Sequence, residues 1–154
     1  MCGIAGFTFN NAVPDPGAIA SDMLAAIAHR GPDEQDIVIR DGLAFAHNRL
    51  TIMEPTGGQQ PRINKANGNT LIYNGEIYNH HAFDDELLSA GCELRDHCDT
   101  ETLFWLLELH GIEKTLSMID GMFVFAWYEA QDDTLYLARD RFGQKPIFYA
   151  SIGG

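Results

Sequence analysis

The stretch DIVIRDGLAFAH, residues 36–47, is the clearest local indication of how this chain folds. Apolar and polar residues alternate on both sides of Asp41-Gly42, and an Asp-Gly pair between two alternating segments is typical of a tight β-hairpin. A hairpin pairs its two strands antiparallel. The stretch therefore predicts antiparallel sheet rather than the parallel sheet of a fold in which strands and helices alternate strictly.

The segments before the hairpin predict a strand and a helix. GIAGFTF, residues 3–9, is short, apolar and aromatic, as in a buried strand. Asp15-Pro16 is a good helix start, because Asp can serve as N-cap and Pro fits the first helical turn. We expect this helix to end at HRGPD, residues 29–33, which contains Gly and Pro.

The chain after the hairpin predicts a long loop, two helices and further strands. Residues 54–69 are rich in Gly, Pro, Asn and Gln, so we expect a loop, and loops of this length are usually functional or mobile. Helical spacing is present at 80–90 and 99–110, and each segment is followed by a C′ glycine, Gly91 or Gly111. Strands are expected at residues 69–75, 122–129, 134–140 and 146–151. Together these elements predict one α+β domain with largely antiparallel sheets.

Charge and composition exclude several classes of function. The 154 residues carry a formal net charge of −12, which repels phosphates and anionic lipid, so we expect neither nucleic acid nor a membrane as partner. The longest apolar run, GMFVFAWY, is too short to span a bilayer, and the N-terminus does not resemble a signal peptide. The three cysteines have no framework spacing and no CxxC, which predicts a cytoplasmic location and no metal site.

Six segments interrupt the ordinary patterning of strands and helices. They are HRGPD (29–33), HNRLTI (47–52), GGQQP (57–61), NGEIYN (74–79), CDTE (98–101) and RDRFGQKPIFY (139–149). In this order behind an N-terminal MCGI, they resemble the glutaminase domain of glutamine-dependent asparagine synthetases, a branch of the class II glutamine amidotransferases. The resemblance covers residues 1–154 as one domain and implies the αββα sandwich of the N-terminal-nucleophile hydrolases.

The resemblance gives the cysteine at position 2 a chemical role. It implies hydrolysis of the glutamine side-chain amide to glutamate and ammonia, through a thioester on Cys2. A thiol with an ordinary pKa of about 8.5 needs a base. A free α-amino group titrates at about 7.7–8.0, so an N-terminal cysteine carries its own base. Met1 must therefore be removed, because the nitrogen of a Met1–Cys2 peptide is an amide and cannot accept the proton.

The resemblance also implies roles for residues further along the chain. Asn74 and Gly75 are expected to form the oxyanion hole, although an Asn-Gly pair is by itself a common turn. Arg49 is suited to bidentate binding of the glutamine α-carboxylate. Asp99 and Glu76 are the candidates for the α-ammonium group. Asp99 also stands where the N-cap of the following helix belongs, and one carboxylate can serve both roles.

Other residues support or depart from this site. We expect Thr51 and Ile52 to line the substrate pocket, and Arg30 to support the first strand. Cys98 replaces the small residue, such as Ser, that is usual in the family, which places a second thiol near the pocket. No Gly-rich phosphate loop occurs, so no cofactor is expected in this chain. In the family, ATP and Mg²⁺ belong to a synthetase domain, and no such domain is recognised here.

The family's sandwich continues beyond the last segment of this chain. We therefore expect a sandwich truncated at its C-terminal end, with an exposed strand edge at 146–151. Exposed edges and apolar patches favour association, so a two-fold homodimer through these strands is expected.

Three functions stay open on the sequence. The chain could be a glutaminase that supplies ammonia to an asparagine-synthetase-type domain or subunit. It could be a free-standing γ-amide hydrolase, or a catalytically silent module that binds glutamine. The intact set of Cys2, Arg49, Asn74-Gly75 and Asp99 favours an enzyme over the silent module.

Overall fold

The part of the chain that the structure describes begins with a strand, β1, and its last regular element is also a strand, β7. The computed structural model describes residues 2–10, 12–40, 42–50, 57–96 and 98–152. In chain order its elements are β1 (Gly3–Thr8), α1 (Pro16–Ala26), η1 (Ala28–Arg30), β2 (Glu34–Arg40), β3 (Leu43–Arg49), β4 (Arg62–Ile63), β5 (Thr70–Ile77), η2 (His80–Phe83), α2 (Asp84–Ser89), α3 (Asp99–Met118), β6 (Gly121–Glu129) and β7 (Thr134–Arg139).

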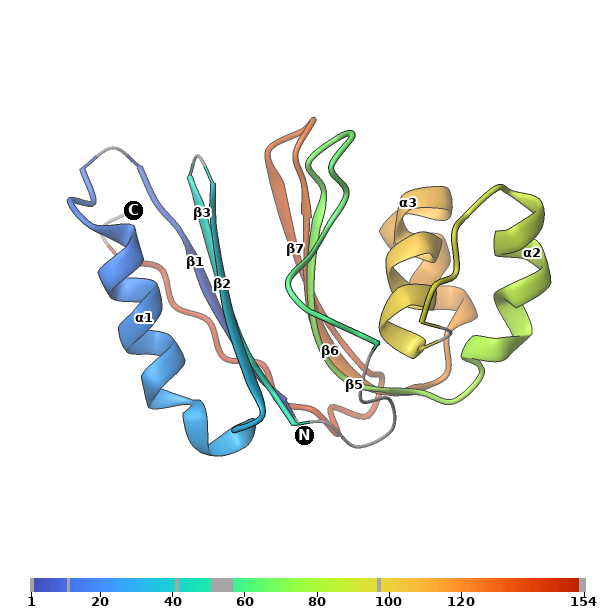
Figure 1. The fold of residues 1–154 in the computed structure, drawn as a ribbon, viewed down its shortest axis with the longest axis horizontal. Coiled ribbons are helices and arrows are strands. Elements are labelled where there is room, and N and C mark those ends of the chain that lie inside the picture. The colour runs from blue at the N-terminus through green and yellow to red at the C-terminus, as the bar shows by residue number, and fades with distance from the viewer. Residues whose placement is uncertain (1, 11, 41, 51–56, 97, 153–154) are drawn as a thin grey trace.

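These elements form four layers (Figure 1). α1 covers the outer face of a sheet with strand order β1-β3-β2, and α2 and α3 cover the outer face of a second sheet with order β4-β5-β6-β7. All strand pairs that the structure describes are antiparallel. The αββα sandwich with antiparallel sheets is therefore confirmed.

The predicted hairpin forms at the edge of the first sheet. β2 and β3 pair antiparallel from Glu34↔Arg49 to Arg40↔Leu43. Asp41 lies outside the described residues, but Gly42 has a φ of 78°, which a glycine adopts without strain. The loop expected at 54–69 contains one short strand that the sequence did not predict, β4, which pairs with β5.

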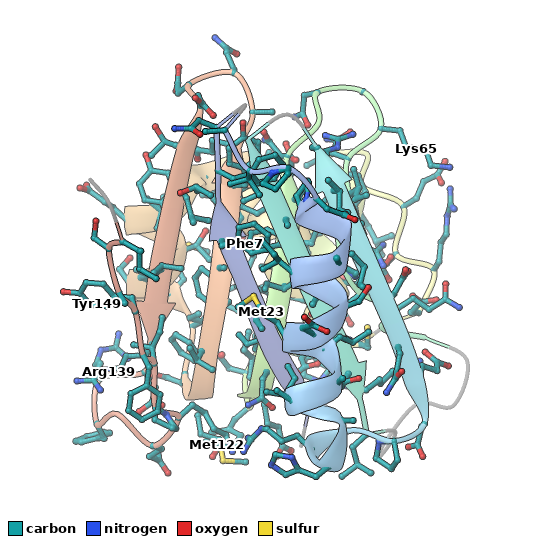
Figure 2. All side chains as sticks on the ribbon, turned by 90° about the vertical axis from the view of Figure 1, so that its left-hand side faces the viewer. Phe7, Met23, Lys65, Met122, Arg139 and Tyr149 are labelled. Carbon is teal, nitrogen blue, oxygen red and sulfur yellow. The ribbon has the colours of Figure 1, made fainter. Side chains whose placement is uncertain are left out.

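α1 begins where the sequence predicted. Asp15 is the N-cap, and its carboxylate accepts a hydrogen bond from the Ala18 N–H at 2.9 Å. Ala20 and Leu24 are the buried residues of this helix. Figure 2, which views the molecule from the α1 side, shows the helix lying across β1 and its neighbours. The helix thus shields the first sheet from solvent.

Two apolar clusters hold the layers together. The cluster between the sheets is formed by Leu43, Phe45, Ile72, Ala126 and Tyr128. The larger cluster lies between the second sheet and its helices and contains Leu71, Tyr73, Ile77, Leu87, Leu103, Phe104, Leu106, Leu107, Ile119, Phe123, Phe125 and Trp127. Because β5 and β6 contribute to both clusters, the position of the β5 side chains is fixed from two sides.

The third helix is longer than predicted. Gly111 has the left-handed φ of 72° that a helix C′ glycine typically adopts. The chain nevertheless returns to helix and continues to Met118. Ile112, Leu116 and Met118 pack against the larger cluster, and this burial favours a second helical segment that local signals did not reveal.

The strand predicted at 146–151 is wrong. In the described residues this segment has no strand pairing, and Phe148 and Tyr149 are 91% and 85% exposed. Figure 2 shows Tyr149 on the outer edge of the molecule. An apolar, aromatic segment becomes a strand only when a neighbouring strand accepts its backbone hydrogen bonds. The strand edge through which a homodimer was expected to form is therefore missing from the described residues. The homodimer itself stays a prediction.

No helix within the described residues is long and apolar enough to cross a membrane.

Candidate active site

A cavity of about 610 Å³ lies where several elements begin or end. Cys2 precedes β1, Arg49 ends β3 and Asp99 begins α3, and all three line the cavity. The last residues of β5 line it as well, among them Asn74, Gly75 and Glu76. This is the lower end of the sandwich in Figure 1, where the N-terminus lies. Of the predicted site residues, only Ile52 (with Thr51) lies outside the described residues.

Cys2 directly precedes β1, and two other segments contact it. Its Sγ lies 4.0 Å from the Leu50 carbonyl oxygen, and its own carbonyl accepts a hydrogen bond from Arg30 Nε at 3.4 Å. The expectation that Arg30 supports the first strand is consistent with this contact. The thiol is half-buried in the cavity wall, so a small ligand can reach it.

Asn74 presents a buried amide to the cavity. The residue is 5% exposed, and its side-chain amide has no hydrogen-bond partner among the described residues. Such an amide is available to a ligand oxygen. The next residue must be glycine for a steric reason, because a Cβ on Gly75 would lie 2.3 Å from the Met122 carbonyl oxygen and 2.6 Å from Phe123 Cα. Gly75 thus lets β5 approach β6 closely beside the cavity.

Arg49 is a buried cation rather than a surface one. Its Nη1 forms an ion pair with Glu34 Oε2 at 2.9 Å, and its Nη2 donates to the Gly57 carbonyl. The Glu34 side chain is 46% exposed, so this ion pair alone does not explain why the guanidinium is buried at the cavity. These contacts fix the orientation of the guanidinium in the cavity wall, and a guanidinium group is suited to binding an anionic group.

Asp99 does not cap its helix, contrary to one of the two roles considered for it. The N-cap is Cys98, which makes no side-chain capping bond, and Asp99 is the first helical residue. One carboxylate oxygen of Asp99, Oδ2, accepts hydrogen bonds from the Tyr73 hydroxyl at 2.6 Å and the Ile77 N–H at 3.1 Å. Both donors belong to β5, and their hydrogen bonds satisfy this oxygen in place of the helix N–H groups.

The cavity contains further residues to which the sequence assigned no role. Gly58, Gln60, Tyr73 and Lys145 line it. Gly58 and Gln60 belong to the GGQQP segment, and Lys145 belongs to the RDRFGQKPIFY segment. Both segments interrupt the patterning of strands and helices, and this interruption could have indicated that their residues belong to the site. Nothing in the sequence around Tyr73 indicated a role in the site, because an aromatic residue is common in a buried strand.

Asp140 organises the turn that carries Lys145 to the cavity. Its carboxylate accepts hydrogen bonds from the backbone N–H groups of Phe123, Phe142, Gln144 and Lys145 at 3.0–3.3 Å. Four N–H groups on one carboxylate are a strong local tether. The Asp140 side chain therefore fixes the chain direction after β7.

The second thiol, Cys98, lines the same cavity, as expected. Burial raises the pKa of the Cys98 thiol. A smaller thiolate fraction at neutral pH makes it a slower nucleophile. Reagents directed at the cavity are therefore expected to modify Cys2 in preference to Cys98.

His47 is a buried, neutral imidazole beside the site. It lies on the side of β3 that faces the second sheet, since it alternates with Phe45 of the inter-sheet cluster. Burial and the neighbouring Arg49 guanidinium lower the pKa of His47 to about 4. The unfolded chain binds this proton near pH 6.5. The contribution of the neutral His47 to the free energy of unfolding is therefore fully present above pH 6.5, and it is lost as the pH falls from there toward 4.

We expect the free energy of unfolding to fall by about 2 kcal/mol through His47 alone between pH 7 and pH 5. Urea unfolding at both pH values, on the wild type and on His47→Gln, measures this contribution as the difference between their pH slopes. His81→Gln is the matched control, because the His81 side chain is 69% exposed. Equal slopes for wild type and His47→Gln would show that His47 does not resist protonation in the folded state.

Among the described residues, no group of three or more His, Cys, Asp or Glu side chains is placed to hold a metal ion.

The chain matches a known domain family and several curated proteins. The sequence model described as "glutamine amidotransferase domain" matches residues 1–154. Similar curated proteins include the glutamine-hydrolyzing asparagine synthetase 3 of Bacillus subtilis (strain 168), 33% identical over 99% of this chain and 25% of that protein. Another is the glutamine-hydrolyzing asparagine synthetase of Rattus norvegicus, 37% identical over 80% of this chain and 22% of that protein. The chain thus spans about a quarter of the length of these relatives.

Solved structures support the fold. The chain is similar to a glutamine phosphoribosylpyrophosphate amidotransferase from B. subtilis, complexed with ADP and GMP, with a TM-score of 0.51 and 24% identity over 66% of this chain and 24% of that one. It is also similar to an allosteric regulatory enzyme of purine biosynthesis, with a TM-score of 0.52. At this identity the likeness shows the shared sandwich alone.

Proposed function

Because the chain belongs to the glutamine amidotransferase domain family, we propose that it hydrolyses the side-chain amide of L-glutamine to glutamate and ammonia. The observation that carries the proposal is the shared cavity, in which the Cys2 thiol and the unpartnered amide of Asn74 both reach the same space. A nucleophile and an amide donor in one cavity are the minimum set for acyl transfer at an amide carbon.

The proposed reaction uses groups of Cys2 and water. With Met1 removed, the α-amino group of Cys2 takes the thiol proton, and Sγ attacks the amide carbon. The resulting oxyanion is bound by the Asn74 amide and the Gly75 N–H. The C–N bond then breaks, the amine returns the proton to the leaving nitrogen, and ammonia departs. Water hydrolyses the thioester and releases glutamate, so no cofactor takes part.

The remaining cavity residues are proposed to hold the amino acid end of glutamine. Arg49 binds the α-carboxylate, and Asp99 with Glu76 binds the α-ammonium group. Glu76 lines the cavity and forms no hydrogen bond or ion pair among the described residues, so its carboxylate is available. Ile52 is proposed to complete the pocket wall.

We further propose that the ammonia is used by an asparagine-synthetase-type unit, in the same polypeptide or in a partner, with aspartate as acceptor. The similarity to glutamine-hydrolyzing asparagine synthetases supports this proposal. ATP and Mg²⁺ would act on that unit and not in this cavity.

Arg49→Ala is expected to raise the KM for glutamine about 10- to 100-fold with little change in kcat, because a charge-assisted contact to the α-carboxylate persists through the reaction. Arg40→Ala is the matched control. Arg40 also donates to a glycine carbonyl, that of Gly68 at 2.6 Å, but it does not line the cavity. An unchanged KM in Arg49→Ala would place the carboxylate elsewhere.

The proposed function is tested by glutamate release from purified protein and by intact mass after treatment with a diazoketone analogue of glutamine. We expect turnover and a single adduct, both lost in Cys2→Ala and both retained in Cys98→Ser. Glutamine binding without turnover in the processed wild type would instead indicate a silent binding module. Turnover without transfer to any acceptor would indicate a free-standing hydrolase.

A further inference from the structure

The carboxylate of Asp99 is bound asymmetrically. Oδ2 accepts two hydrogen bonds from β5, one from the Tyr73 hydroxyl at 2.6 Å and one from the Ile77 N–H at 3.1 Å. The other oxygen, Oδ1, has no hydrogen-bond partner among the described residues. Asp99 lines the cavity, so one oxygen anchors the side chain and the other is left for a ligand.

Tyr73 is itself held firmly. The residue is 2% exposed and belongs to the larger apolar cluster. Its backbone N–H donates to the buried Gln60 side chain at 2.6 Å. Burial, and then the adjacent Asp99 carboxylate, hold the pKa of Tyr73 well above its usual value. The hydroxyl therefore keeps its proton at any physiological pH and serves as a donor to Asp99.

The contact joins two segments that the chain brings together only by folding. Tyr73 points from β5 toward the first turn of α3, and its hydroxyl holds the Asp99 carboxylate on the β5 side of the helix. A carboxylate that is ordered before the ligand arrives loses less conformational freedom on binding. The geometry thus prepares Oδ1 for a cation in the cavity.

From these contacts we infer that Tyr73 is a positioning residue that makes the site selective for substrates with an α-ammonium group. This inference rests on the proposed function, since it assigns the cation to the amino group of glutamine. The Tyr73 hydroxyl donates to Asp99, so we expect it to matter for ligands with the ammonium group and not for ligands that lack it.

The test compares binding of L-glutamine and of glutaramate, the same amide without the amino group, by calorimetry. Both are measured in a Cys2→Ala background, in which no turnover occurs. Adding Tyr73→Phe is expected to weaken L-glutamine binding about tenfold, the effect of losing one hydrogen bond to a charged group. Glutaramate binding is expected to change less than twofold.

Tyr128→Phe is the matched control. Tyr128 lies on the neighbouring strand β6, and its hydroxyl donates to the Asp133 carboxylate at 2.7 Å, outside the cavity. We expect the melting temperature of the Tyr128→Phe variant to fall about as far as that of Tyr73→Phe. Binding of both ligands should be unchanged in the Tyr128→Phe variant.

Equal weakening of both ligands in Tyr73→Phe, or no weakening of either, would overturn the inference. Failure of the Cys2→Ala protein to bind L-glutamine at all would overturn it as well. If the wild type does not release glutamate while the selective effect of Tyr73→Phe persists, the inference holds and the proposed hydrolysis does not.

Discussion

Protein that keeps Met1 is expected to hydrolyse glutamine about 10²- to 10⁴-fold more slowly than protein that begins at Cys2, the range that a positioned general base contributes. An α-amino group can accept the thiol proton near neutral pH, whereas the amide nitrogen of a Met1–Cys2 peptide cannot. The nearby buried His47 does not line the cavity. His80 and His81 do line it, so the comparison of the two preparations also tests whether a cavity histidine can replace the amine.

The experiment uses one preparation from cells with methionine aminopeptidase inhibited and one from untreated cells, each identified by intact mass. Glutamate release is compared at saturating glutamine. Processed Cys2→Ala supplies the background rate, because it has the amine but no thiol. Equal turnover by the two Cys2 preparations would show that the base is not the N-terminal amine.

Asn74→Ala is expected to lower kcat about 10²- to 10³-fold, the usual loss for one oxyanion-hole donor. Glutamine binding should change less than about threefold, because the contact to the amide oxygen strengthens only as negative charge develops. The effect on kcat can be measured separately from any loss of stability. The Asn74 amide is buried and has no partner among the described residues, so its removal breaks no hydrogen bond that they make.

Asn48→Ala is the control for loss of a buried amide. Asn48 is fully buried, and its Nδ2 donates to the Leu24 carbonyl at 2.8 Å, which ties β3 to α1. We expect this variant to be less stable but to keep its kcat. If Asn74→Ala instead raises KM and leaves kcat unchanged, the Asn74 amide binds the ground state and is not the oxyanion donor.

Local patterns predicted much of the fold because their causes are local. The Asp15 cap and the β2–β3 hairpin depend on residues close together in the sequence, and the helical spacing of Leu103, Leu106 and Leu107 marks the face of α3 that is buried. The error at 146–151 has the opposite origin. That segment has the composition of a strand, but in the described residues no neighbouring strand accepts its hydrogen bonds.

Residue patterns were enough to predict antiparallel sheets, and the family resemblance predicted the sandwich and the candidate residues around Cys2. How those residues are held depends on contacts made in the folded chain. The tertiary structure paired Arg49 with Glu34 and turned Asp99 away from its helix toward Tyr73. Tyr73 and Asp99 are separated by 26 positions. Their contact depends on how α3 packs against β5, and no pattern of neighbouring residues encodes that geometry.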